Sequence, residues 1–236
     1  SLIFMAKVLT IIPARGGSKR IKNKNIKKFL GKEIILYPIE SALSSEFVDE
    51  VFVSTDSLGI KDVAIFAGAN VPFLRSEKAS NDYATTFDVI KEVAEKYEGI
   101  EKFDYIACLY PTSVFVTKTV FDDALDKLIS SNASSVVTVL EYSHPIQRCL
   151  NVDDENMIEI VNQDNYNTRS QDLEPRYHDA GQLYIFKLEK AMEDRKLITS
   201  SSIAYILPQN KAQDIDTDED WAVAEAKYKV MMDIVK

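Results

Sequence analysis

The stretch that decides the fold runs from residue 6 to residue 28: AKVLTIIP (6–13) followed by ARGGSKRIKNKNIKK (14–28). The first part is a short apolar run that ends in turn residues, which is typical of a buried strand in a parallel sheet. The second part has two adjacent glycines and seven basic side chains, with no acid among them. Glycines let the backbone N–H groups approach a phosphate, and Arg and Lys neutralise its charge. We therefore predict a strand followed by a loop that binds a triphosphate.

Downstream of this stretch, strand-like and helix-like segments alternate. Strands are predicted at 50–54, 71–75, 105–109, 134–140, 183–186 and 202–207, and helices at 36–44, 58–67, 86–97, 117–130 and from Asp218 onward. Alternation of this kind predicts a Rossmann-like three-layer α/β/α fold, with a mainly parallel sheet and ligands at the carboxyl ends of the strands. We expect one domain over residues 5–236. Residues 141–181, rich in Asn, Asp, Gln and Tyr, are expected to form a small insertion.

Charge and cysteine content narrow the function class. The net charge is −9, yet residues 1–32 carry nine Lys and Arg and no acid. This pattern indicates an anion site within an acidic protein and argues against binding to nucleic acid or to an anionic membrane surface. The alternative is a solvated basic face. With no long apolar run and only Cys108 and Cys149, we expect a cytoplasmic protein without a membrane span or a disulfide framework.

The opening stretch resembles the first motif of the CMP-sugar synthetases. These enzymes are the nonulosonic acid cytidylyltransferases, which activate sialic-acid-like sugars. The matching motifs follow in order: IPARGGSKRIKNKNI (12–26), VSTD (53–56), FLR (73–75), PTS (111–113) and DIDT (214–217). Two more segments, HPIQR (144–148) and NTRSQDLEPRYHDAGQLYIF (167–186), resemble the branch that makes CMP-pseudaminic acid. The glycine pair fits neither the dinucleotide fingerprint nor the phosphate loop that ends in Gly-Lys-Ser/Thr.

This resemblance implies a reaction and a set of partners. CTP and a nine-carbon acidic sugar would be joined with release of pyrophosphate, for surface glycan or flagellin glycosylation, by a homodimer built through residues 141–181. Sialic, legionaminic and 3-deoxy-octulosonic acids are alternative sugars. A different class is a nucleotide-binding regulatory protein that has kept the fold without turnover.

The resemblance also implies roles for individual residues. Catalysis is expected of Arg15, Lys19, Lys24 and Asp216. Contacts with CTP are expected of Ala14, Arg15, Gly16, Gly17, Ser18, Asn25, Arg75, Asp82 and Thr86. Contacts with the sugar are expected of Tyr110, Thr112, Ser113, Arg148, Arg169, Gln171, His178 and Asp179, for which the alternative is a surface or subunit-interface position. Two departures from the family pattern, Val114 for a proline and Tyr110 for a glutamine, bear on sugar contacts.

Asp214 and Asp216 are the predicted metal ligands. Residues two apart on an extended segment project to the same side, so both carboxylates can face one Mg²⁺ ion. The alternative is that the pair only precedes and caps the final helix.

In-line attack of the sugar hydroxyl on the α-phosphorus needs positioning and charge neutralisation more than a covalent intermediate. Either Asp216 or a metal-held hydroxide could accept the proton, and the sequence does not choose between them.

Overall fold

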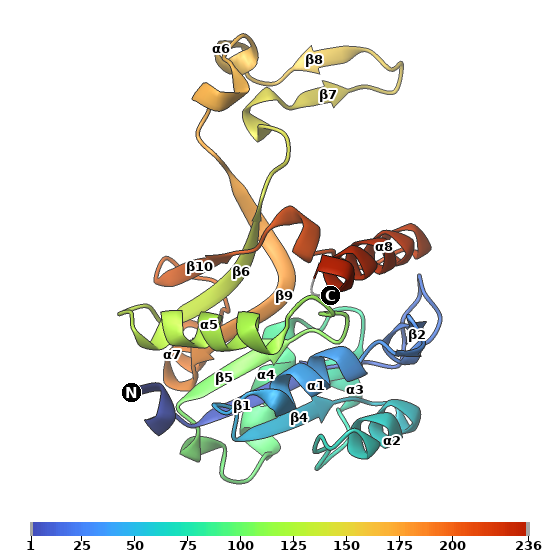
Figure 1. Ribbon diagram of the computed structural model, residues 1–236, viewed down its shortest axis with the longest axis vertical. Coiled ribbons are helices and arrows are strands. Elements are labelled where there is room, and N and C mark those ends of the chain that lie inside the picture. Colours follow the sequence, from blue (N-terminus) through green and yellow to red (C-terminus); the bar gives the residue numbers. More distant parts are fainter. Residues whose placement is uncertain (1, 235–236) are drawn as a thin grey trace.

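The computed structural model describes residues 2–234 and is built around one six-stranded sheet (Figure 1). Its strands are β1 (Val8–Pro13), β4 (Glu50–Ser54), β5 (Tyr105–Leu109), β6 (Ser135–Glu141), β9 (Tyr177–Lys187) and β10 (Ser202–Ile206). They lie in the order β10-β6-β9-β5-β1-β4. β1 pairs parallel with β4 and β5, and β10 pairs parallel with β6, whereas β9 runs antiparallel to both of its neighbours. The predicted mainly parallel sheet is confirmed.

Helices cover both faces of this sheet. The longer ones are α1 (Leu36–Ser44), α2 (Leu58–Phe66), α4 (Thr86–Lys96), α5 (Lys118–Ile129), α7 (Leu188–Asp194) and α8 (Asp218–Ile234). Short helices are α3 (Glu77–Ser80), α6 (Gln163–Tyr166) and six 3₁₀ turns at Leu2–Met5, Lys24–Ile26, Ile100–Lys102, Ile146–Arg148, Ser170–Asp172 and Gln209–Lys211. No helix within residues 2–234 is both long and apolar enough to cross a bilayer.

Side chains of β1 show why the molecule has three layers. Ile12 belongs to the apolar cluster shared with α1, α2 and α5, whereas Ile11 belongs to the cluster shared with α4 and α7. Successive residues of a strand point to opposite faces, so an uninterrupted apolar strand requires cover on both. The predicted α/β/α layering is therefore confirmed.

One predicted strand, 71–75, is wrong. Only Asn70 forms a β-bridge there, opposite Phe52 at the free edge of β4. At the other end of the segment, Arg75 N donates a hydrogen bond to Thr55 O, just after β4, at 2.8 Å. The segment between these points is irregular, because it leaves the sheet edge and crosses toward α3.

A third apolar cluster joins the two ends of the chain. Phe29 of β2 (Lys28–Phe29), which pairs with β3 (Lys32–Glu33), packs edge-on against Trp221 of α8 with ring centroids 5.8 Å apart. Tyr37 and Tyr228 belong to the same cluster, with ring centroids 5.3 Å apart. Residues 20–30 are thereby held beside the segment that precedes α8.

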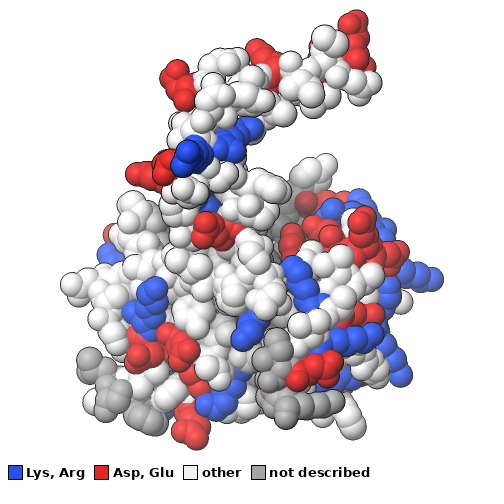
Figure 2. Space-filling view, turned by 45° about the horizontal axis from the view of Figure 1, so that its top comes forward, with Lys and Arg blue, Asp and Glu red and all other residues white. Residues whose placement is uncertain are grey.

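Residues 142–176 form an arm that projects from the body between β6 and β9 (Figures 1 and 2). The two strands remain paired as far as Glu141 and Tyr177 and lead the chain into it. Its far end carries a hairpin of β7 (Leu150–Val152) and β8 (Ile158–Ile160) together with α6. The arm overlaps the insertion predicted at 141–181, but residues 177–181 belong to β9 of the central sheet.

Candidate active site

A cavity of about 660 Å³ opens at the carboxyl ends of β1 and β5. Pro13 ends β1, Tyr110 follows β5, and the two strands are neighbours in the sheet. Because the chain leaves β1 toward β4 on one side and β5 lies on the other, a crevice forms at this point, as in other open α/β sheets. Twelve predicted site residues line the cavity: Arg15, Ser18, Lys19, Lys24, Asn25, Arg75, Asp82, Thr86, Tyr110, Thr112, Asp214 and Asp216.

The loop after β1 is held in place by backbone hydrogen bonds to the end of β4 and to the residues that follow it. Ala14 N donates to Ser54 O at 2.8 Å, and Gly16 N donates to Oδ1 of Asp56 at 2.8 Å. A Cβ on Gly16 would lie 3.0 Å from Cβ of Ser57, a tight contact that favours glycine at this position. Ala14 and Gly16 therefore fix the loop through their backbone N–H groups, and neither they nor Gly17 line the cavity.

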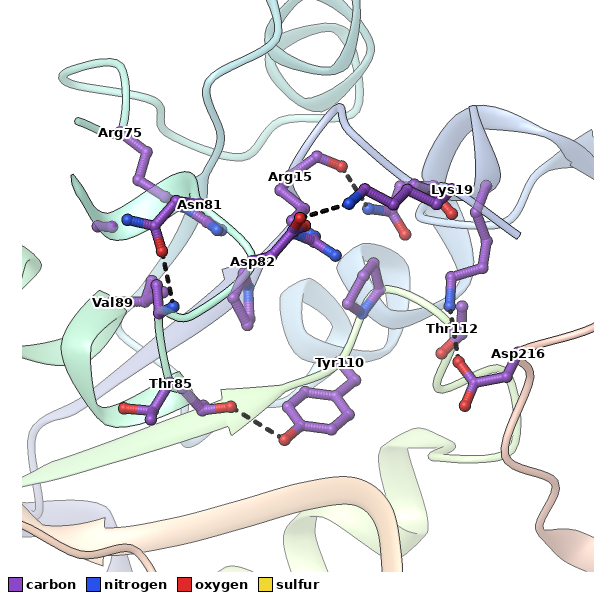
Figure 3. A pocket seen from close by; sticks show the side chains of 18 of the residues that line it. Arg15, Lys19, Arg75, Asn81, Asp82, Thr85, Val89, Tyr110, Thr112 and Asp216 are labelled. Atoms are coloured by element: carbon purple, nitrogen blue, oxygen red, sulfur yellow. Dashed lines mark hydrogen bonds and ion pairs between the residues drawn. The ribbon is translucent and has the colours of Figure 1, made fainter. Parts of the chain in front are cut away.

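Two cations of the loop are paired with one carboxylate. Nη1 of Arg15 lies 3.0 Å from Oδ1 of Asp82, and Lys19 Nζ contacts the other oxygen of the same group (Figure 3). Hydrogen bonds from Lys19 and Arg15 lower the pKa of Asp82. All three side chains are exposed, so a phosphate group could replace Asp82 as the partner of both cations.

At the other wall of the cavity the two predicted metal ligands project together. Ile215 is fully buried in the α8 cluster, and the residues on either side of it, Asp214 and Asp216, line the cavity. Oδ1 of Asp216 lies 3.0 Å from Nη2 of Arg20 and 3.4 Å from Nζ of Lys24. The alternating direction expected of Asp-Ile-Asp is present.

These carboxylates do not cap the final helix. Thr217 Oγ1 accepts from Asp220 N at 3.1 Å, while Oδ2 of Asp220 accepts from Thr217 N at 2.8 Å. This reciprocal pair satisfies the first turn of α8. The side chains of Asp214 and Asp216 are therefore not used as helix caps, and both line the cavity.

The chemistry of this pair fits a hard cation. Partial desolvation in the cavity wall and then the negative charge of Asp216 raise the pKa of Asp214. A carboxylate held beside a second carboxylate in a cavity wall is the kind of ligand set that Mg²⁺ stabilises. No group of three or more His, Cys, Asp or Glu suited to a metal occurs among the described residues. A bound Mg²⁺ would thus take its other ligands from water and from substrate phosphates.

Other residues of the cavity wall are held by uncharged partners. Arg75 is buried and donates to Ser54 through Nε (3.1 Å to Oγ) and Nη2 (2.6 Å to the carbonyl oxygen), and its burial lowers the pKa of the guanidinium. Asn25 donates to the carbonyl of Arg15 at 3.0 Å, and its buried Oδ1 has no protein partner. Thr86 Oγ1 and the Tyr110 hydroxyl are 3.1 Å apart. These polar side chains could contact a polar planar group such as a nucleobase.

The structure separates most predicted sugar residues from the cavity. Ser113 is buried and donates to Gln182 O at 2.9 Å. Arg148, Arg169 and Gln171 lie in the arm, where Arg148 donates to the carbonyl of Thr168. His178 and Asp179 lie at the start of β9, and none of these five lines the cavity of the same chain, because β6 and β9 carry the arm away from the body.

Some residues of the site could not be assigned from the sequence. Arg20 belongs to the basic run, but only the structure shows its contact with Asp216. Asp56 stands at the end of a predicted strand, within the VSTD motif, and that position was the available signal. Asn81 and Thr85 also line the cavity, and no pattern of residues indicated them.

Comparison with known proteins gives a consistent result. The cytidylyltransferase family model matches residues 9–213. The chain is 39% identical over 225 residues to pseudaminic acid cytidylyltransferase of Campylobacter jejuni, covering 95% of this chain and 97% of that protein. It is 32% identical to CMP-N,N'-diacetyllegionaminic acid synthase of Legionella pneumophila, covering 93% and 95% respectively.

A solved structure shares the fold. CMP:2-keto-3-deoxy-manno-octonic acid synthetase, complexed with CTP, superposes with a TM-score of 0.68 at 17% identity, covering 97% of this chain and 100% of that one. The family model covers most of the chain, and the sequence relatives are matched over nearly their whole length. The chain belongs to the cytidylyltransferase family.

Proposed function

We propose that this protein transfers CMP from CTP to pseudaminic acid, forming CMP-pseudaminic acid and pyrophosphate. One observation carries the proposal: cations from residues 15–24 and the carboxylates of Asp214 and Asp216 line a single cavity. The similarity to pseudaminic acid cytidylyltransferases supports the choice of sugar.

The reaction follows from the charges in this cavity. The anomeric hydroxyl of the sugar would attack the α-phosphorus of CTP in line with the departing pyrophosphate. Arg15, Lys19 and Lys24 would neutralise the triphosphate and the leaving group, so that positioning and electrostatics supply most of the acceleration. Arg15 and Lys19 must first exchange Asp82 for phosphate oxygens.

Mg²⁺ is part of the proposal. Asp214 and Asp216 would hold it, and when bound it would neutralise charge on the phosphate oxygens. On binding the metal, Asp216 would release its ion pairs with Arg20 and Lys24. Both cations would then be available to the phosphates.

We also propose a homodimer joined through the arm. Exposed apolar side chains gather on its hairpin and beside it: Leu150, Val152, Met157, Ile158 and Val161. Apolar surface concentrated on a projecting element marks an interaction site. In such a dimer, Arg148, Arg169 and Gln171 would face the second subunit.

We place the reaction in the reducing cytoplasm, because both cysteines are free thiols.

The test is pyrophosphate release with CTP, Mg²⁺ and each candidate sugar in turn. Release with pseudaminic acid, and little with ATP in place of CTP, is expected. Faster release with sialic, legionaminic or 3-deoxy-octulosonic acid would reassign the sugar. No release with any of them, despite CTP binding, would favour the regulatory protein instead.

A further inference from the structure

We propose that Lys227 is a positioning residue for the metal ligands, because its ammonium fixes the backbone that carries Asp214 and Asp216. The inference deepens the proposed function, since it rests on the proposed binding of Mg²⁺ by these two carboxylates. Lys227 lies on α8 and does not line the cavity, so it would act only through the segment that leads into Asp214.

The segment that carries the two ligands depends on side chains for its shape. Residues 212–217 lie outside the strands and helices, between the 3₁₀ turn at Gln209–Lys211 and the start of α8 at Asp218. A segment of this kind has no ladder of backbone hydrogen bonds to fix its direction, and it fluctuates unless other groups hold it. Ligands of a small cation need a fixed geometry, so the groups that hold this backbone matter for the metal.

Lys227 holds the first half of the segment through three acceptors. Its Nζ donates to the carbonyl of Ala212 at 2.9 Å, to Oε1 of Gln213 at 2.9 Å and to the carbonyl of Gln209 at 3.1 Å. Nε2 of Gln213 in turn donates to the carbonyl of Asp214 at 3.1 Å. A path of hydrogen bonds therefore runs from the ammonium to the peptide group of the first metal ligand.

The second half of the segment is held by other groups. Oδ2 of Asp220 accepts from Asp216 N at 3.0 Å, and Nζ of Lys24 donates to the carbonyl of Ile215 at 2.8 Å. The side chain of Ile215 is also fully buried in the α8 cluster. The half that contains the first ligand is thus the part whose position depends on the ammonium from α8.

The bonds of Lys227 contribute more to geometry than to overall stability. Its three acceptors are uncharged, the side chain is half-buried, and burial lowers the pKa of the ammonium. The cost of desolvating a charge offsets much of what hydrogen bonds to neutral acceptors contribute. We therefore expect the protein to fold without this ammonium, but with a less ordered segment before Asp214.

Removal of Lys227 separates positioning from simple electrostatics by the sign of its effect. Lys227→Met keeps a side chain of similar length and removes the charge and the donors. On charge alone, loss of one cation should strengthen the binding of another cation nearby. Loss of positioning should instead weaken metal binding by about 10- to 100-fold, the range for groups that orient metal ligands.

Titration of the full chain with Mn²⁺, without nucleotide or sugar, measures this through the electron paramagnetic resonance signal of the unbound ion. The binding that Asp214→Asn abolishes defines the site. Lys227→Met should weaken this binding and speed hydrogen exchange at residues 212–217, with a urea midpoint close to that of wild type. Lys229→Met is the matched control: it removes an exposed lysine from the same helix and should bind Mn²⁺ at least as tightly as wild type.

Gln213→Leu provides a second variant in case Lys227→Met does not fold. It breaks the same path without a change of charge, so weaker Mn²⁺ binding is again expected. Unchanged or tighter binding in the folded variant would overturn the inference, as would equal weakening by Lys229→Met or a wild type that binds no Mn²⁺ at Asp214. If the Mn²⁺ results are as expected but wild type releases no pyrophosphate, the inference holds and the proposed reaction fails.

Discussion

The ammonium of Lys24 lies 3.4 Å from Oδ1 of Asp216, although 192 positions separate them in the chain. The same ammonium donates to the carbonyl of Ile215 at 2.8 Å. This proximity depends on the packing of Phe29 against Trp221, which fastens the segment after β1 to α8. The first cations and the last carboxylates of the site are therefore brought together by an apolar cluster that includes Ile215 itself.

Replacing Lys24 by methionine should remove a cation from the phosphate end of the cavity. We expect kcat/KM for CTP to fall by about 100-fold, since one preorganised charge contact is lost. Lys27→Met is the control, because Lys27 pairs with Asp218 at 3.0 Å outside the cavity. Steady-state kinetics on both variants checks this. Equal losses in the two would show that the effect is structural.

Asp82 should compete with phosphates for Arg15 and Lys19. Asp82→Asn is therefore expected to tighten the binding of inorganic tripolyphosphate by about two- to fivefold, the range for exposed ion pairs. Titration calorimetry measures the affinity. Glu193→Gln, which breaks an exposed pair with Lys190 on α7, should have no effect. Weaker binding by Asp82→Asn would mean that the carboxylate orients the cations instead of competing for them.

Glu92 should stabilise the protein in a pH-dependent way. Burial alone raises the pKa of Glu92, but hydrogen bonds from the hydroxyl and backbone N–H of Ser76 outweigh it and lower the pKa. The folded carboxylate thus binds protons less readily than the unfolded one. Its stabilisation is complete above the unfolded pKa, about 4.5, and is lost as the pH falls through the lower folded value.

Glu92→Gln should accordingly lower the free energy of unfolding by about 1–3 kcal/mol near neutral pH. The difference from wild type should shrink in acid. Urea denaturation at two pH values measures it, with Glu95→Gln, an exposed partner of Lys91, as the control. A difference that stays constant with pH would remove the carboxylate charge from the explanation.

Much of the fold could be predicted because its strands are apolar and locally bounded. Segments 50–54 and 105–109 coincide with β4 and β5. β9 was predicted only at 183–186, although it spans Tyr177–Lys187, because its first half is polar and is a strand only through pairing with β6. The error at 71–75 has the opposite cause: the segment is apolar enough for a strand but forms no β-bridge after Asn70.

The residues of the site can likewise be divided into those that the sequence predicts and those that it does not. Arg15, Lys24 and the Asp214/Asp216 pair could be predicted because their chemistry is visible in short motifs. The Lys227 to Ala212 contact depends on how α8 packs beside the segment before it, and Glu92 depends on how α4 packs against Ser76. No local pattern contains that information.

The arm should control assembly. Ile158 on β8 is 66% exposed, so Ile158→Glu would place a charge in the proposed dimer contact. Sedimentation analysis should show a dimer for wild type and a monomer for this variant. Phe66→Glu is the control, since Phe66 on α2 is 93% exposed and distant in sequence from the arm, and it should leave the dimer intact. A dimeric Ile158→Glu variant would place the contact elsewhere.

The most direct test of the account is pyrophosphate release by wild type and Asp216→Ala, with CTP, Mg²⁺ and pseudaminic acid. Circular dichroism first confirms that both are folded. We expect rapid release by wild type and a loss of about 100-fold or more in the variant, since metal and phosphate contacts both fail. Turnover by a folded Asp216→Ala near the wild-type rate would contradict the convergence of the two chain ends on one catalytic centre.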